Sequence, residues 1–146
     1  MPFAGFPRDV HFTPVPGPLF GPLLEQIDDL SELKCTLRLI WLLHQKRGSP
    51  RYVTLREMQA DRVLAKALST QGDTTSSELA RAMTLAVRRG TVVSGHIQNK
   101  GAHEQAYALN TELDRRALEA TAVEGQAVSS AEPGVEPWDG ATERPN

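Results

Sequence analysis

Residues 75–110 constrain the fold most, because they predict one amphipathic helix that passes through a glycine into a β-hairpin. Thr75 and Glu78 fit a T-x-x-E capping box, which marks the start of a helix. Gly90 is suited to end the helix, since glycine tolerates the left-handed conformation of a C-terminal cap. Between these points the predicted core face holds apolar residues at helical spacing, namely Leu79, Ala82, Met83 and Ala86.

After Gly90, two β-type segments face each other across a polar turn. Residues 92–97 are expected to pair with residues 106–109, and the turn between them contains Asn99, Lys100 and Gly101. Upstream helices, then a long helix, then a hairpin is the element order of a winged helix-turn-helix. We therefore predict a mainly α fold with a small β-hairpin, of the winged helix-turn-helix class.

Capping signals also mark the shorter helices. Thr54 and Glu57 form a second capping box, which predicts a helix over residues 55–60. Asp61 can cap a helix over residues 62–68, with Val63, Leu64 and Leu68 turned inward. Thr111 can cap a helix over residues 112–122, whose inward side is expected to hold Leu113, Ala117 and Ala120.

Residues 30–47 form the strongest predicted helix, which Asp29 can cap. One predicted face holds Leu33, Leu37, Ile40 and His44, and other apolar residues cover most of the remainder. Only a narrow polar stripe is left, consisting of Lys34, Arg38, Trp41 and Gln45. A helix that is apolar over most of its circumference is buried on several sides. This helix is therefore predicted to be central, or to meet another chain.

The two ends of the chain differ from its centre. Residues 1–20 contain five prolines and predict an extended arm that docks by its aromatic side chains, on a partner subunit or on its own domain. Residues 21–122 would form the winged-helix domain, and the acidic residues 123–146 a disordered tail. With Trp41 on a polar stripe, the arm predicts a homo-oligomer whose interface includes Phe12 and Trp41.

The formal net charge of −2 hides an uneven distribution. Between Lys34 and Arg116 the chain has 14 Lys and Arg against 7 Asp and Glu, whereas the segments outside have 2 Arg against 11 acids. A basic centre between acidic ends favours a polyanionic partner, and the alternative is an ordinary solvated surface.

The predicted helix of residues 75–89 carries a polar stripe opposite its core face, formed by Ser77, Arg81, Thr84 and Arg88. Arginine suits phosphates and guanine edges, and hydroxyl groups contact phosphates or bases. A recognition helix in a major groove needs such a face. We predict DNA as the partner, and the remaining candidate contacts are Arg89, Lys100, Arg51 and Arg56. The alternative is a solvated helix face.

Sequence signatures of enzymes are missing, including the G-x-x-x-x-G-K-[ST] and H-E-x-x-H motifs. We therefore predict no enzymatic activity and no cofactor. The four histidines show no metal-ligand spacing, so no metal site is predicted. The single cysteine, Cys35, lies in an apolar run and is interpreted as a small core residue. One cysteine, no signal-peptide pattern and no long apolar run together predict a cytoplasmic protein without a membrane partner.

Several segments resemble a known family. The runs QIDDLSELK, WLLHQKRGSPRYVTLREM, AVRRGTVV and YALNT, within Pro14 to Leu118, are similar to the N-terminal winged-helix domain of DnaD-like primosomal proteins. The resemblance implies a winged helix with a part in replication initiation or primosome assembly. Two alternatives stay open, a winged-helix transcriptional regulator and a protein-interaction module that does not bind DNA.

Overall fold

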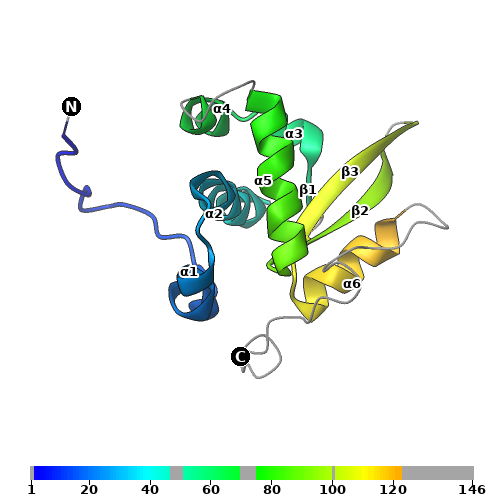
Figure 1. The fold of residues 1–146 in the computed structure, drawn as a ribbon, viewed down its shortest axis with the longest axis horizontal. Coiled ribbons are helices and arrows are strands. Elements are labelled where there is room, and N and C mark those ends of the chain that lie inside the picture. The colour runs from blue at the N-terminus through cyan, green and yellow to red at the C-terminus, as the bar shows by residue number, and fades with distance from the viewer. Residues whose placement is uncertain (1, 47–50, 70–74, 100, 123–146) are drawn as a thin grey trace.

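The computed structural model describes residues 2–46, 51–69, 75–99 and 101–122 (Figure 1). In these residues the chain is mainly helical, with a small antiparallel sheet. The helices are η1 (Gly17–Phe20, a 3-10 helix), α1 (Pro22–Gln26), α2 (Leu30–Gln45), α3 (Leu55–Gln59), α4 (Arg62–Leu68), α5 (Thr75–Arg89) and α6 (Glu112–Thr121). The strands are β1 (Val53–Thr54), β2 (Val92–Asn99) and β3 (Ala102–Leu109).

Four helix starts follow the predicted capping residues, whereas Thr75 itself lies within α5 and the Glu78 carboxylate binds Ser31 and Arg81. The side chains of Asp29, Asp61 and Thr111 each accept a hydrogen bond from the backbone N–H three residues later, at 2.9–3.0 Å. Thr54 and Glu57 make both bonds of a capping box. At the end of α5, Gly90 has φ +92°, a conformation that side chains with a Cβ atom rarely adopt. These short-range signals therefore placed the starts of α2, α3, α4 and α6 correctly.

The sheet has three strands in the order β1-β3-β2. β2 and β3 form the predicted hairpin, in register from Val92↔Leu109 to Asn99↔Ala102. β1 adds a short antiparallel edge through Val53↔Tyr107 and Thr54↔Ala106. Because side chains alternate along a strand, the two faces of this sheet pack against different layers.

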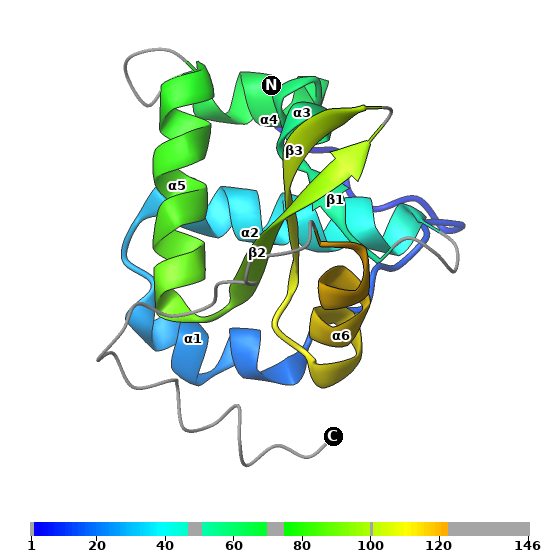
Figure 2. The same ribbon diagram turned by 90° about the vertical axis from the view of Figure 1, so that its right-hand side faces the viewer.

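The main core lies between α2–α5 and the inner face of the sheet (Figures 1 and 2). Its fully buried side chains include Leu39, Met58, Leu79, Met83 and Val92. On the outer face of the sheet, Val93, Ile97, Ala106 and Ala108 pack against Leu118 of α6. A third cluster joins Leu19 and Leu23 of η1 and α1 to Ile40 of α2. Hence α2 is central, but it is not covered all round.

The predicted apolar face of α2, formed by Leu33, Leu37, Ile40 and His44, is only partly buried. Ile40 is buried, but Leu37 is 43% exposed and His44 is exposed. The buried face instead holds Ser31, Glu32, Cys35, Thr36 and Leu39. Periodicity alone could not choose between faces, because α2 is apolar over most of its circumference. The buried side of α2 is decided by its polar residues Ser31 and Glu32, which form hydrogen bonds with residues of α5.

Two shorter helices also turn differently from the prediction. Val63 on α4 is 51% exposed, while Leu64 and Leu68 are buried as predicted. On α6, Leu113 is 62% exposed, and the inward residues are Asp114 and Leu118. Asp114 can be buried on the inward side of α6 because its carboxylate forms an ion pair with Arg51.

Within the described residues, none of the helices combines the length and apolar character needed to span a bilayer.

Candidate nucleic-acid interface

The candidate interface is the outward face of α5, opposite the buried residues of that helix. Its exposed side chains are all small, polar or cationic, namely Ser76, Ser77, Ala80, Arg81, Thr84 and Arg88. All four residues of the predicted stripe are among them, so the structure brings them together on one surface. A face without bulky apolar side chains can approach a nucleic acid closely.

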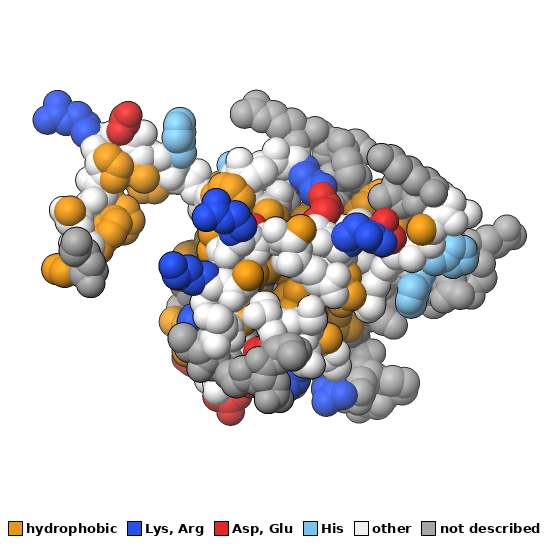
Figure 3. Space-filling view, turned by 90° about the horizontal axis from the view of Figure 1, so that it is seen from above, with side chains coloured by type: hydrophobic (Ala, Val, Ile, Leu, Met, Phe, Trp, Pro, Cys, Tyr) orange, Lys and Arg blue, Asp and Glu red, His pale blue; other side chains and the backbone are white. Residues whose placement is uncertain are grey.

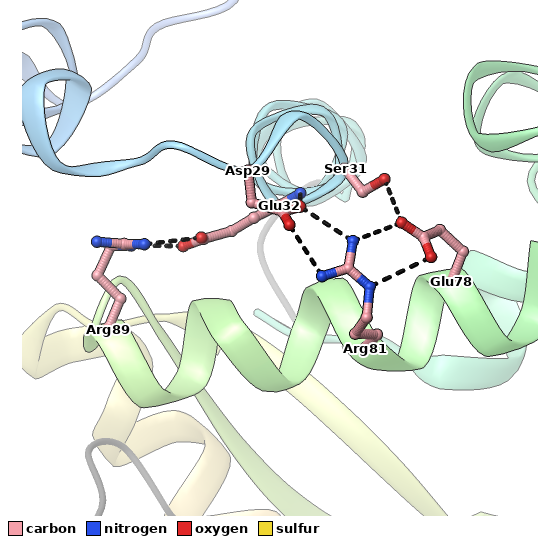
Figure 4. Close-up of polar contacts among 6 residues, drawn as sticks. All are labelled: Asp29, Ser31, Glu32, Glu78, Arg81 and Arg89. Atoms are coloured by element: carbon pink, nitrogen blue, oxygen red, sulfur yellow. Dashed lines mark hydrogen bonds and ion pairs between the residues drawn. The ribbon is translucent and has the colours of Figure 1, made fainter. Parts of the chain in front are cut away.

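Arg81 is exposed, but its guanidinium forms ion pairs with carboxylates of the same chain (Figure 4). Its guanidinium donates to Asp29, the residue before α2, at 2.8 and 3.2 Å. It also donates to Glu78 on its own helix, at 2.5 and 3.2 Å. Ser31 of α2 donates to the same Glu78 carboxylate at 2.6 Å. These contacts tie the middle of α5 to the start of α2 and offset the charge of the most central arginine of the stripe.

The ionisation of this cluster follows its geometry. The Arg81 guanidinium lowers the pKa of Asp29, and together with the Ser31 hydroxyl it lowers the pKa of Glu78. The two carboxylates in turn raise the pKa of Arg81. All three groups therefore stay charged at neutral pH, and the net charge of the trio is negative.

We expect this pairing to make stability depend on pH. A carboxylate with a lowered folded pKa stabilises the fold above its ordinary value, 3.8 for Asp29, and the contribution disappears as pH falls through the lowered pKa. Asn can still cap α2 but carries no charge. Urea unfolding should show the parent more stable than Asp29→Asn at about pH 6, and the difference should shrink as the pH falls below 3.8 and through the lowered pKa of Asp29. A difference that does not change with pH would contradict this expectation.

Arg89 points toward α2 and joins the end of α5 to it, instead of pointing into solvent (Figure 4). It donates to the Glu32 carboxylate at 2.6 and 2.9 Å, and to the carbonyl of Gln26 at 3.2 Å. The Glu32 side chain is fully buried. The Glu32 contact raises the pKa of Arg89. While these bonds are formed, the Arg89 guanidinium faces α2 and does not point outward to bind a DNA phosphate.

The other predicted contacts are spread over the molecule. Arg51 pairs with Asp114 of α6. Arg56 is 75% exposed on α3 and lies 3.7 Å from Glu104 of β3. Lys100, at the hairpin turn, falls outside the described residues. Arg56 is the more exposed of these two arginines.

The sequence analysis missed these ion pairs because the partners are far apart in the chain. Arg81 and Asp29 are separated by 52 residues, and Arg89 and Glu32 by 57. Similar pairs join Arg38 to Asp61 and Lys46 to Glu57. The basic centre is thus partly neutralised, in places by acids from the segment before Lys34.

Comparisons with protein families, with curated proteins and with solved structures find no match to this chain.

Proposed function

We propose that this chain is a winged-helix domain of the DnaD-like kind, that it binds DNA through the outward face of α5, and that it takes part in replication initiation or primosome assembly. The observation that carries DNA binding is the exposed α5 face, where Ser77, Thr84 and Arg88 stand among small side chains. The replication role rests on the resemblance of the segments between Pro14 and Leu118.

The arrangement of elements supports the winged-helix assignment. The chain runs from α2 through the short edge strand β1 to α3 and α4, then to α5 and the β2–β3 hairpin. The sheet order β1-β3-β2 joins the hairpin to β1, as a wing requires. In this assignment α5 is the recognition helix. α4 is an additional helix between the two helices of the motif.

Arg88 gives the direct test of this proposal. It is exposed in the last turn of α5, so Arg88→Ala should weaken DNA binding without unfolding the protein. Loss of a phosphate contact should reduce the salt slope by about one unit. Loss of a guanine contact should instead cost about 1–3 kcal/mol at one base pair. Salt-titrated fluorescence anisotropy with single- and double-stranded probes measures both effects.

A matched control and a gain-of-binding variant sharpen this test. Arg116→Ala is the control, because it removes an exposed arginine from a different helix, α6. The Arg116 side chain is 73% exposed and pairs with Glu112. It should leave affinity almost unchanged. Asp29→Asn removes a carboxylate from Arg81 and should tighten binding. If Arg88→Ala and Asp29→Asn both bind as the parent does, α5 is not the DNA-binding surface.

A second candidate function is a protein-interaction module with no DNA contact. The ion pairing of Arg81 and Arg89 favours it, because two of the predicted DNA contacts are held within the fold. It predicts no salt-dependent binding to either probe. The anisotropy titration of the parent protein therefore separates the two functions directly.

A further inference from the structure

The outward side of α4 carries two cations that the fold itself does not use. Arg62 and Lys66 are one helical turn apart and both are exposed, while Leu64 and Leu68 anchor the opposite side of the helix in the core. Among the residues that the structure describes, no carboxylate pairs with either cation. The helix therefore presents two positive charges on one exposed stripe.

Most cations elsewhere in the described chain are already paired. Lys34 lies beside α4 and donates to the backbone carbonyl of Ala67 at 3.0 Å, a neutral group that leaves its charge in place. Hence the positive excess of the described surface collects at α4. Carboxylates of the same chain pair instead with Arg38, Lys46, Arg51, Arg81 and Arg89.

The position of Arg62 does not favour the helix that carries it. Arg62 is the first residue of α4, near the positive end of the helix dipole, where acids are stabilising and cations are not. The capping carboxylate of Asp61 is already bound to Arg38 of α2. An exposed cation at this place adds nothing to the stability of the fold. A negatively charged ligand would account for it.

The two cations lie beside the start of the proposed recognition helix. α4 packs against α5, and both lie at the end of the molecule toward which the β2–β3 hairpin points (Figure 1). Figure 3 looks onto this end and shows several Lys and Arg side chains on its surface. The first turn of α5 adds Ser76 and Ser77, which are exposed there. Small hydroxyl side chains thus adjoin the cations of α4.

We propose that Arg62 and Lys66 of α4 bind the phosphates of double-stranded DNA while α5 contacts its bases. This inference rests on the proposed DNA binding and locates its backbone contacts. Residues one helical turn apart have Cβ atoms about 5–6 Å apart, which suits neighbouring phosphates of one strand. Such contacts fix the register of a protein on the duplex without reading its sequence. The additional helix of the motif thereby has a function.

The charges of α5 make α4 the better place for a phosphate strand. Arg81 is outnumbered by its two carboxylates, Asp29 and Glu78, so the middle of α5 offers a phosphate little attraction. The Arg89 guanidinium is held by Glu32. The α4 cations have no such counter-charges among the described residues. Hence the backbone is attracted to α4 and lies along the start of α5.

Salt-titrated fluorescence anisotropy with short duplexes of different sequence tests this arrangement. The double variant Arg62→Ala with Lys66→Ala should reduce the salt slope by about two units, one for each lost phosphate contact. It should weaken binding by the same factor for every duplex, and its thermal midpoint should match that of the parent. The matched control is Arg8→Ala with Arg116→Ala, which removes two exposed arginines from the arm and α6. It should keep the salt slope of the parent.

Cross-linking then locates the DNA directly. Lys66→Cys carrying a photoreactive maleimide should cross-link to a bound duplex, and Arg116→Cys with the same label should not. Cys35 is fully buried, and burial raises the pKa of its thiol to about 12, so it should escape labelling.

The outcomes separate this inference from the proposed function. If the Arg62 and Lys66 variant keeps the salt slope of the parent, or loses no more than the control does, α4 does not bind phosphates. Weaker binding by Arg88→Ala would then leave DNA binding by α5 in place. A parent protein that shows no salt-dependent binding to any duplex would overturn both.

Discussion

Replacing Glu32 by alanine is expected to lower the free energy of unfolding by about 3–5 kcal/mol, the usual loss when one partner of a buried ion pair is removed. The Glu32 side chain is fully buried, and that of Arg89 is only 20% exposed. Two short hydrogen bonds join them, between the first turn of α2 and the last turn of α5. Without Glu32, a guanidinium that is mostly shielded from water loses its main counter-charge. Urea unfolding followed by circular dichroism measures the loss.

Two variants separate the ion pair from other effects of the substitution. Glu112→Ala removes a carboxylate that also pairs with an arginine, but both side chains are about 70% exposed. It should change stability by about 0.5 kcal/mol or less. The double variant Glu32→Leu with Arg89→Leu should recover most of the loss, because apolar residues often replace a buried pair without cost. A loss below about 1 kcal/mol in Glu32→Ala would mean that this pair does not hold α5 on α2.

The local part of the fold was predictable because its causes are local. The caps at Asp29, Asp61 and Thr111 each depend on a side chain and a backbone group three residues apart. The turn at Gly90 depends on one residue that tolerates a positive φ. Such signals need no knowledge of the tertiary structure. The same holds for the hairpin, whose two strands are adjacent in the sequence.

The candidate site was predictable only in part, because exposure and availability have different causes. Exposure of Ser77, Arg81, Thr84 and Arg88 follows from the period of one helix, and the structure agrees. Whether an arginine can bind a DNA phosphate also depends on whether a carboxylate of the same chain already pairs with it. Asp29 and Glu32 belong to a segment more than 40 residues earlier, and only the packing of α2 on α5 brings them to Arg81 and Arg89. A count of charges along the sequence cannot reveal such neutralisation.

The inward face of α2 depends on these same contacts. Ser31 and Glu32 are polar, yet they are buried because Glu78 and Arg89 of α5 bind them. Turning this side toward α5 leaves Leu30, Leu37 and Trp41 on the outward side, 53%, 43% and 37% exposed. The guanidinium of Arg38 lies 4.0 Å from the Trp41 ring centroid, in a cation–π contact. Polar partners, rather than apolar periodicity, thus decide the rotation of this helix.

Two leucines on α2 test that rotation. Leu39 is fully buried where α2 meets the helices and the sheet, so Leu39→Ala should lower the free energy of unfolding by about 2–5 kcal/mol. Leu37→Ala makes the same chemical change two residues away, at a side chain that is 43% exposed, and should cost about 0.5 kcal/mol or less. Urea unfolding of both variants at low protein concentration compares them directly. Equal losses would contradict the observed rotation of α2, in which Leu39 is buried and Leu37 is 43% exposed. A loss at Leu37 that grows with protein concentration would instead show that a second copy covers the outward face of α2.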